Sequence, residues 1–454
     1  MSFTETKLTF IFSLLCYASS AGFAFAQVDD NAKPAQNVVE AGPFRIHVHC
    51  DNQKVVDQVQ RIGDQTWRIA SKFYACELPD EKLNAHLYRN IDGYNAADEK
   101  LTGGKFKKNQ AFADYNSMSA HVAMQPPISD QLLNIVGLPK QSARLLAHEM
   151  AHLVRCKRMP NTFGDHPDWL IDGAALHIGK QVITSLGYMD QPMSDPNFST
   201  KAAQIKKLLG QNKLPSAKKI LENVPLELPF YERYSVQWVF LDMLMSKHKE
   251  KFLAFMKGLP RIGGGQGYAK RTKDLLLKVL AVDSQTLDKE FQEHLKRLQP
   301  RWIEEIRSLE TAGPTWHQVA FPNSNATCWR QSPLKDSFLI SLTATIHDAD
   351  GKQMNVRIGK STSFTQFSIT AGFGLNVFEF SNKKWTTLVS KQINGLETGA
   401  PMKLSISHDD SKSRTVLKLN GRKIFEGGVQ GSDHTLALGA QKGSVVTWKN
   451  LNIE

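Results

Sequence analysis

The chain has 454 residues, a formal net charge of +12 at pH 7, and a composition that is 41% hydrophobic and 22% charged. A chain of this length exceeds what one hydrophobic core organises, so two or three domains are expected. Its five cysteines are too few for a disulfide scaffold, and its basic residues are dispersed rather than gathered into a nucleic-acid-binding tract. The positive charge instead favours acidic partners, such as anionic envelope polymers, lipid headgroups or acidic peptides.

The first 26 residues have the pattern of a secretory signal peptide. Lys7 precedes an apolar run from Leu8 to Ala26, which ends in the small-x-small sequence Ala24-Phe25-Ala26. We predict cleavage after Ala26 and a secreted or periplasmic protein that is not an integral membrane protein once the signal is removed. The alternative is an uncleaved anchor, because the run is just long enough to span a bilayer.

Residues 27–43 are polar and unpatterned, which predicts a flexible lead-in. Residues 44–199 then predict a domain of strands and helices. The apolar patterns in its first half predict a strand at Phe44–His49, a helix at Val55–Ala75, and strands near Leu83–Arg89 and His121–Gln125. Histidines on the faces of these strands are expected to pack or to face solvent, because their spacing is not that of metal ligands.

Cys50 and Cys76 lie on either side of the predicted helix. A straight helix of that length spans about 30 Å, whereas a disulfide needs Cα atoms within about 7 Å of each other. We therefore do not expect these two cysteines to be bonded to each other unless the helix is broken near Gly63.

The segment His148-Glu149-Met150-Ala151-His152 places two histidines four residues apart in an apolar, helix-compatible stretch. On a helix such side chains lie on the same face, about one turn apart. Two imidazoles placed in this way can bind one zinc ion, and the glutamate beside them can take a proton from water that the metal activates. The pattern predicts the core of a metal-dependent hydrolase. The alternative is a core helix whose two histidines are satisfied within the fold.

A second motif follows after a short loop, in the sequence Trp169-Leu170-Ile171-Asp172-Gly173-Ala174-Ala175. Together the two segments resemble the gluzincin-type zinc metallopeptidases, whose second motif helix typically reads Trp-Leu-x-Glu-Gly-x-Ala. Asp172 stands where that family has the glutamate that is the third zinc ligand. The resemblance implies a zincin-like α+β fold and a Zn2+ cofactor held by His148, His152 and Asp172. It also implies Glu149 as the general base, with the fourth zinc position open to water.

The third ligand stays open at this point, because aspartate is one methylene shorter than glutamate and reaches about 1.5 Å less far. Either the Asp172 helix lies closer to the first motif helix, or the carboxylate binds less directly. His166 and His177 are competing donors, since imidazole also binds zinc. Cys156 continues the four-residue spacing of the two histidines, but a buried thiol at the helix end is expected rather than a ligand or a thiol switch.

Residues 200–312 turn helical and basic. They resemble the helical lobe that follows the zinc site in these peptidases, where a tyrosine at the start of a similar helix can face the cleft. Tyr231 and Tyr234 are therefore candidate donors of a hydrogen bond to the tetrahedral oxyanion. For each tyrosine the alternative is an aromatic side chain that packs on the helix face.

After Ala312-Gly313-Pro314 the pattern changes to short alternating runs punctuated by Gly, Asn and Asp. These runs predict an all-β sandwich, or jelly roll, over residues 315–454. Asn420-Gly421 lies between two such runs and predicts a hairpin turn.

The last runs of this region, Leu436–Gly439 and Val446–Ile453, resemble the closing strands of concanavalin A-like or laminin G-like jelly rolls. The resemblance implies a domain that binds glycans or acts as a spacer. Trp385 and Trp448 are candidates for stacking on sugars, although core packing is expected for each.

These patterns together predict an exported zinc metallopeptidase that hydrolyses peptide or protein substrates. Glu149 would take the proton of the attacking water and pass it to the leaving amine. The C-terminal domain is a candidate contact for a glycan or an anionic envelope polymer. Two other functions stay open. One is a catalytically inactive zincin scaffold that carries a polymer-binding sandwich; the aspartate at position 172, where the family has glutamate, is the sign of this alternative. The other is hydrolysis of a non-peptide amide bond.

Overall fold

We describe the protein from a computed structural model of the whole chain. The structure describes residues 35–107, 109–124, 130, 133–134, 137–159, 167–186, 196–224, 226–263, 265–298, 302–306, 315–319, 326–330, 334–347, 352–429, 434–441 and 444–454. The predicted signal peptide lies outside these residues. Within them, no helix has both the length and the apolar character needed to cross a bilayer.

The N-terminal part is an α+β unit built on a five-stranded sheet of order β1-β2-β3-β5-β4. The three central strands run parallel, and each edge strand is antiparallel to its neighbour. The strands are β1 (Asn37–Ala41), β2 (Phe44–His49), β3 (Leu83–Tyr88), β4 (Ala111–Asp114) and β5 (Ser119–Ala123). The helices are α1 (Gln53–Tyr74), α2 (Ile91–Thr102), α4 (Lys140–Arg158) and α5 (Asp168–Ser185).

Residues 37–41, which the sequence assigned to a flexible lead-in, form strand β1 instead. The strand pairs with β2 across a two-residue hairpin turn, in which Ala41 faces Phe44. Gly42 opens that turn at a φ of +56°, a conformation that glycine adopts without steric cost. The sequence pattern does not indicate this strand, because it is short and only Val39 and Ala41 on it are buried.

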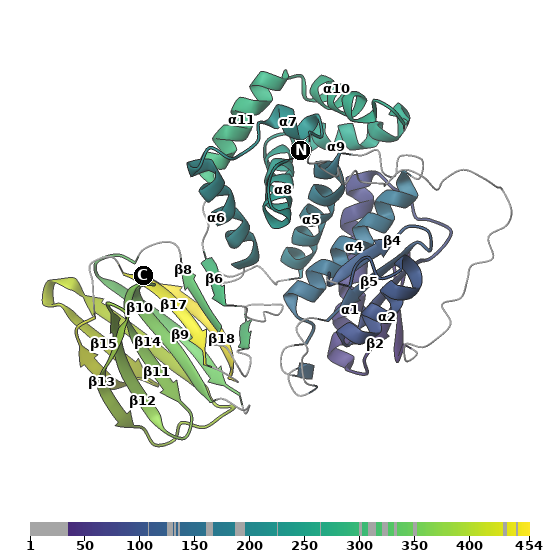
Figure 1. Ribbon diagram of the computed structural model, residues 1–454. Helices are drawn as coiled ribbons and strands as arrows, with labels where there is room; N and C mark the ends of the chain where they lie inside the picture. Colours follow the sequence, from purple (N-terminus) through teal and green to yellow (C-terminus); the bar gives the residue numbers. More distant parts are fainter. Residues whose placement is uncertain are drawn as a thin grey trace, which may run out of the picture.

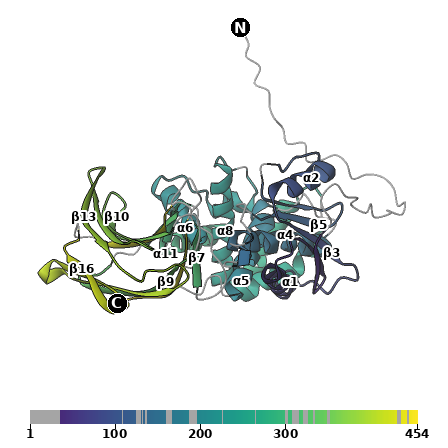
Figure 2. The same ribbon diagram turned by 90° about the horizontal axis from the view of Figure 1, so that it is seen from below.

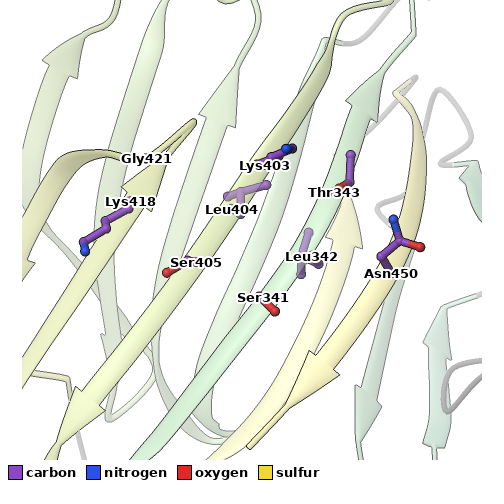
Figure 3. A pocket seen from close by; sticks show the side chains of 9 residues that line it. All are labelled: Ser341, Leu342, Thr343, Lys403, Leu404, Ser405, Lys418, Gly421 and Asn450. Atoms are coloured by element: carbon purple, nitrogen blue, oxygen red, sulfur yellow. The ribbon is translucent and has the colours of Figure 1, made fainter.

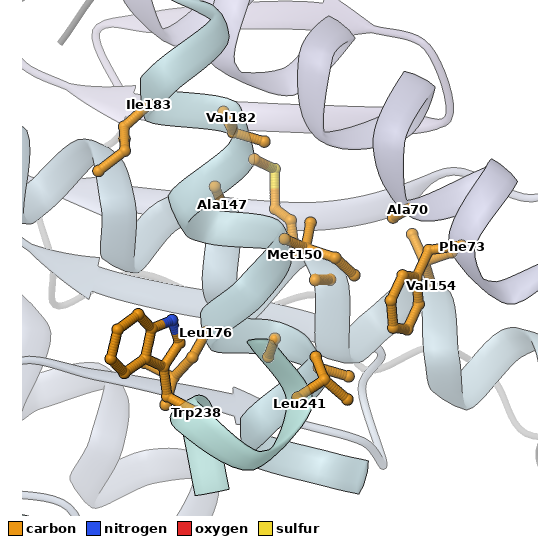
Figure 4. Close-up of a cluster of buried hydrophobic side chains, with 14 of the residues drawn as sticks. Ala70, Phe73, Ala147, Met150, Val154, Leu176, Val182, Ile183, Trp238 and Leu241 are labelled. Atoms are coloured by element: carbon orange, nitrogen blue, oxygen red, sulfur yellow. The ribbon is translucent and has the colours of Figure 1, made fainter. Parts of the chain in front are cut away.

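Helices cover the two faces of this sheet unequally (Figure 1). Helices α1 and α4 pack on one face, against the apolar side chains at alternate positions of the strands, and α2 packs on the other. Helix α5 lies behind α4 in the same core. Figure 4 shows the contact region, where Met150 and Val154 of α4 lie among Phe73 of α1 and Leu176 of α5. The first motif helix is therefore enclosed by packed helices on one side and by the sheet on the other.

A helical region follows the α+β unit. Helix α6 packs against strand β6 (Trp302–Ile306), which belongs to the C-terminal part, and α8 packs on α5. The helices are α6 (Pro196–Gly210), α7 (Ala217–Leu221), α8 (Phe230–Lys247), α9 (Lys249–Gly258), η2 (Leu259–Ile262), α10 (Tyr268–Leu280) and α11 (Ser284–Arg297). In Figures 1 and 2 this region lies between the α+β unit and the C-terminal strands.

The C-terminal part is a β-sandwich of a seven-stranded sheet, β13-β12-β11-β10-β17-β8-β6, and a six-stranded sheet, β16-β15-β14-β9-β18-β7. Apolar side chains from both sheets form its own core. The strands are β6 (Trp302–Ile306), β7 (Thr315–Val319), β8 (Ala326–Arg330), β9 (Phe338–Ile346), β10 (Gln353–Lys360), β11 (Ser363–Thr370), β12 (Gly374–Ser381), β13 (Lys384–Gln392), β14 (Pro401–Asp409), β15 (Arg414–Leu419), β16 (Arg422–Gly427), β17 (Thr435–Ala440) and β18 (Val445–Ile453), with a short η3 (Asp410–Lys412) after β14.

Two sequence features of the sandwich have clear structural outcomes. Asn420 and Gly421 form the turn between β15 and β16, with φ values of +50° and +81°, as an Asn-Gly hairpin turn requires. Trp448 is 2% exposed and packs in the core as expected. The same expectation is wrong for Trp385, which is 52% exposed on β13.

The sandwich begins earlier than residue 315. Strand β6 lies within residues 200–312, the predicted helical lobe, yet it pairs with β8 at the edge of the seven-stranded sheet. A sandwich that starts at Thr315 would lack this strand and leave β8 as an unpaired edge. We expect a fragment of residues 302–454 to unfold at a temperature at least about 3 °C higher than a fragment of residues 315–454, since one lost strand costs more than about 1 kcal/mol. Equal melting temperatures in thermal scans would restore the later boundary.

The face of the N-terminal sheet that α2 only partly covers carries a row of histidines. His47, His86 and His121 lie directly opposite one another on β2, β3 and β5. Their rings stack at centroid distances of 4.5 and 4.8 Å, and Phe112 continues the row 4.7 Å from His121. These histidines pack against each other, which is one of the two arrangements expected from their spacing, and His121 is fully buried.

The buried His121 in this row should lower the stability of the folded protein in acid. Burial lowers the pKa of His121 to about 3, whereas an imidazole in an unfolded chain titrates near about 6.5. Because the pKa of His121 is lowered in the folded state, the stability that the neutral imidazole contributes is present above pH 6.5. It is lost as the pH falls, since only the unfolded state takes up the proton. We expect a loss of about 2 kcal/mol from this histidine between pH 7 and 5. Denaturant unfolding of the metal-free protein at both pH values should show that His121→Gln reduces this loss, and an unchanged loss would contradict the prediction.

Candidate metal centre

Helix α4 presents its motif side chains in a buried environment. His148, Glu149 and His152 are 5%, 7% and 4% exposed. The four-residue spacing brings the two histidines to the same side of the helix, where their Nε2 atoms lie 3.0 Å apart and their rings meet at 84°. The two ring nitrogens therefore face a common point.

Helix α5 brings a carboxylate to that point. Asp172 Oδ1 lies 3.9 Å from Nε2 of His148 and 3.6 Å from Nε2 of His152. Ligands of a tetrahedral zinc ion, with bonds of about 2.0–2.2 Å, are separated by about 3.3 Å, and the three observed separations bracket this value. Within the described residues, these side chains are the set of three potential ligands whose binding atoms all lie within 4.8 Å of one another.

Two glycines of α5 explain how the shorter aspartate reaches this position. A Cβ atom on Gly179 would lie 3.1 Å from the carbonyl oxygen of Arg144 on α4, and one on Gly173 would lie 2.9 Å from the carbonyl oxygen of Gln237 on α8. Both values are shorter than ordinary contacts, so a side chain at either position would push the helices apart. The glycines allow α5 to approach α4 closely, which offsets the missing methylene of Asp172.

The two histidines are uncharged at neutral pH. Burial lowers the pKa of His152 to about 3, and burial and the neighbouring His152 lower the pKa of His148 well below its usual range. A neutral imidazole is the form that binds a metal ion. The pair is thus in the state needed for ligation without the loss of a proton.

The two carboxyl groups show the opposite shift. Burial, and then the charge of Asp172, raise the pKa of Glu149 to about 8. Burial, and then Asp168, raise the pKa of Asp172 to about 7. Two buried carboxyl groups near each other are costly to ionise, and a divalent cation between them and the imidazoles would reverse both shifts.

The structure separates the two candidate tyrosines. Tyr231 is 72% exposed at the start of α8 and does not enter the site. Tyr234 is half-buried one turn later, and its side chain is hydrogen-bonded to Asp172. As a donor to a carboxylate oxygen, Tyr234 orients the candidate third ligand, and it is the one of the two that is placed beside the reacting groups.

The competing ligands do not join the cluster. His177 lies further along α5, where its Nε2 is 2.7 Å from the side-chain amide of Gln181 and its ring packs near Phe73. His166 lies outside the described residues. Cys156 is a free thiol, 8% exposed, and burial raises its pKa, which is the state of an inert buried cysteine. Cys50 and Cys76 are also free, as the helix length between them predicted.

Four further side chains at or near the site were not predicted from the sequence. Tyr115 comes from the β4–β5 turn and places its ring against His152, with a hydrogen bond to the buried Arg155. Arg144 and Lys201 both lower the pKa of His148 through their charge. Arg144 stands four residues before His148, so the helical spacing could have revealed it. The others come from distant segments or another helix face and carry no sequence signal.

A separate hollow lies on the outer face of the six-stranded sheet of the sandwich (Figure 3). Its volume is about 330 Å³. Its lining combines hydroxyl, amide and ammonium side chains with apolar surface, and it consists of Ser341, Leu342, Thr343, Lys403, Leu404, Ser405, Lys418, Gly421 and Asn450. None of these residues belongs to the candidate metal centre.

No protein-family model matches the sequence, and no curated protein matches it. Among solved structures, the chain is similar to a carbohydrate-binding module from Bacillus subtilis, with 13% identity and a TM-score of 0.30 over 34% of this chain and 95% of the module. It is also similar to the metal-free carbohydrate recognition domain of Emp46p, with 9% identity and a TM-score of 0.29 over 35% of this chain and 89% of that domain. Sheep galectin-11 in complex with glycerol gives 10% identity and a TM-score of 0.23 over 30% of this chain and all of that chain. At these values the likeness does not extend to ligand or activity.

Proposed function

We propose that the protein is an exported zinc metallopeptidase with a zincin-like catalytic unit. The observation that carries the proposal is the convergence of His148, His152 and Asp172 on one point, with Glu149 adjacent on the same helix. Two neutral imidazoles and one carboxylate are a donor set that suits zinc, and three protein ligands leave a position for water or substrate. The signal-peptide pattern supports export.

The chain's own residues have distinct roles in the proposed hydrolysis. A zinc ion in this position supplies a Lewis acid that polarises the scissile carbonyl and lowers the pKa of a water molecule. Glu149 accepts the proton of the attacking water and returns it to the leaving amine. Tyr234 holds Asp172 by its hydrogen bond, and the packed helices around α4 keep bulk water away from the base.

The test combines metal content with hydrolysis. We expect the purified mature chain to bind one zinc ion, to cleave a mixed peptide library, and to lose cleavage when a chelator removes the metal. Cleavage should return when zinc is restored. A screen of non-peptide amides on the same sample separates a peptidase from a hydrolase of another amide. Bound zinc with no turnover on any substrate would instead identify an inactive scaffold.

A second candidate function is glycan or polymer binding by the sandwich, and the exposed Trp385 favours it. Its ring lies 5.5 Å from the buried Phe364 and 4.9 Å from the partly buried Phe380, so Trp385 packs at the edge of a small aromatic cluster and leaves about half of its own surface open to solvent. Aromatic rings of this kind combine a large apolar face with low conformational entropy. We expect Trp385→Ala to weaken retention on insoluble polysaccharides, whereas Leu388→Ala, a control on the same exposed strand, should not. Equal retention of both variants would remove this candidate.

A further inference from the structure

We propose that the hollow on the outer face of the six-stranded sheet binds an acidic polysaccharide, a chain of hydroxylated sugar rings that carry carboxylate groups. The hollow crosses four adjacent strands of that sheet, β15, β14, β9 and β18 (Figure 3). It is distinct from the candidate metal centre, and Trp385 lies on the other sheet. The proposal therefore does not rest on the hydrolysis proposed above. It gives the second candidate function, polymer binding by the sandwich, a location and a class of ligand.

Alternation along the strands places polar side chains on the outer face of the sheet. Ser405 on β14 lies opposite Lys418 on β15 and opposite Ser341 on β9. Two residues earlier on β14, Lys403 lies opposite Thr343. The residues between them on each strand are buried in the sandwich core. Directly opposite side chains have Cβ atoms about 4.5–5.5 Å apart and diagonal ones about 7–8 Å apart, so these five residues form one continuous polar patch in which the two lysines are diagonal neighbours.

A fixed turn borders this patch on one side. The backbone N–H of Asn420 donates to the carbonyl oxygen of Lys403, and the backbone N–H of Lys403 donates to Oδ1 of Asn420, both at 2.8 Å. Gly421 lines the hollow. A Cβ atom on it would have no atom of the described residues within 4 Å beyond its chain neighbours. The turn between β15 and β16 is therefore held against β14 and leaves open space beside Gly421.

A bulge in β18 borders the patch on the other side. Lys449 lies opposite Thr343, but Asn452 lies opposite Ser341, so β18 has one residue more than β9 between these pairs. Such a bulge changes the direction of a side chain. Here it brings Asn450 to the lining of the hollow, with a φ of +53°, a conformation that asparagine tolerates. The bulge thus adds an amide, with both donors and an acceptor, to the polar patch.

The positive charge in the hollow is not neutralised by the protein. Lys403 and Lys418 form no ion pair among the described residues, and no acidic residue lines the hollow. On the same sheet, by contrast, Arg414 and Lys423 both pair with Glu426. A bound anion would supply the counter-charge that the two lysines lack, and the net charge of +12 favours its approach.

The lining fits a polysaccharide better than a peptide strand. Strands β14 and β9 are paired on both edges, so a peptide cannot add to the sheet there as a further strand. The groups that are available are three hydroxyls and one amide, which exchange hydrogen bonds with sugar hydroxyls, and two ammonium groups, which attract carboxylates. Four strands at a spacing of about 4.8 Å extend over about 14 Å, which accommodates a short run of sugar rings. A neutral glycan would leave the lysines without a counter-charge.

Two matched oligosaccharides test the proposal. Oligogalacturonate and its fully methyl-esterified form have the same chain length and ring hydroxyls, but the carboxyl groups of the ester carry no charge. In calorimetry with the full mature chain, we expect oligogalacturonate to bind at least about 10-fold more tightly than the ester, as charged hydrogen bonds predict. The difference should shrink at high salt. If the wild type binds neither compound, or binds both equally, the proposal is overturned.

Lysine variants locate the binding. Lys403→Gln and Lys418→Gln should each weaken binding of oligogalacturonate by about 3- to 10-fold, and the double variant should lose the preference over the ester. Both lysines are exposed, and thermal scans confirm that the variants fold. Lys391→Gln removes the same charge from the exposed strand β13 of the other sheet and should bind as the wild type does. Equal losses in all three single variants would show that net charge, not the hollow, carries the binding.

Two further outcomes would also overturn the site or its ligand. Loss of oligogalacturonate binding in Trp385→Ala but not in the lysine variants would place the polymer on the seven-stranded sheet. Polyglutamate of matched charge has no ring hydroxyls and should bind more weakly than oligogalacturonate, and equal binding would make the occupant an acidic peptide. None of these measurements needs zinc or turnover, so a negative result leaves the peptidase proposal unchanged, and an inactive enzyme leaves this one unchanged.

Discussion

Replacement of Asp172 by alanine is expected to reduce zinc affinity by more than about 100-fold. Changes to groups that merely orient ligands already cost about 10- to 100-fold in metal affinity, and this change removes a ligand outright. The geometry supports the expectation, because the carboxylate lies 3.6 and 3.9 Å from the two imidazole nitrogens. Zinc competition with a chromophoric chelator measures the affinity, and Asp172→Glu is expected to retain binding in part.

His177→Ala is the matched control for this variant. It removes a buried histidine from the same helix, but one that is bonded to Gln181 rather than directed at the cluster. It should leave zinc affinity unchanged. The reverse result, with zinc lost in His177→Ala and kept in Asp172→Ala, would reassign the third ligand.

The metal-free protein should not suffer from the loss of Asp172. The pKa of this group is raised to about 7, above its unfolded value near about 4. Because the pKa of Asp172 is raised in the folded state, the stability that its protonated carboxyl group contributes is present at low pH and is lost as the pH rises toward 7. Asp172→Asn removes that dependence, so the metal-free variant should be at least as stable as the wild type at pH 7, and the wild type should gain more stability from added zinc.

Replacement of Glu149 by glutamine should have the second large effect. Glutamine keeps the size of the side chain but cannot accept a proton, so we expect peptide turnover to fall by about 10²- to 10⁴-fold, the usual contribution of general-base catalysis. Zinc stoichiometry should stay at one, because Glu149 is not among the three converging ligands. Turnover within tenfold of the wild type would remove Glu149 from the catalytic role, whereas His148→Gln should lose both zinc and turnover.

The motif residues were predictable from sequence because helical spacing fixes which side chains share a face. His148 and His152 needed only a helix to come together, and the apolar residues around them indicated one. Asp172 needed more, namely two helices close enough for a short side chain to reach. That closeness depends on Gly173 and Gly179, whose contacts with α8 and α4 are not visible in the sequence.

Other features of the fold and of the site depend on pairings between distant segments. Strand β6 follows directly on helical sequence and is defined by its partner β8. Tyr115 reaches the metal centre from a strand turn, and the charge of Lys201 acts on His148 from α6, where nothing in the local pattern marks either residue. Trp385 has a large aromatic side chain of the kind that usually packs in a core, but it lies exposed on an edge strand. In each of these cases the position of the residue or strand is set by how distant segments pack together, which the local sequence pattern does not determine.

Diffraction from a crystal of the zinc-loaded protein, measured on both sides of the zinc absorption edge, would locate the metal ion and its ligands. We predict one strong anomalous peak, bonded at about 2.0–2.2 Å to Nε2 of His148, Nε2 of His152 and a carboxylate oxygen of Asp172. Glu149 should lie beside the peak without binding it. A peak held by other residues, such as the histidine row of the N-terminal sheet, or no peak near α4 and α5, would contradict the assignment.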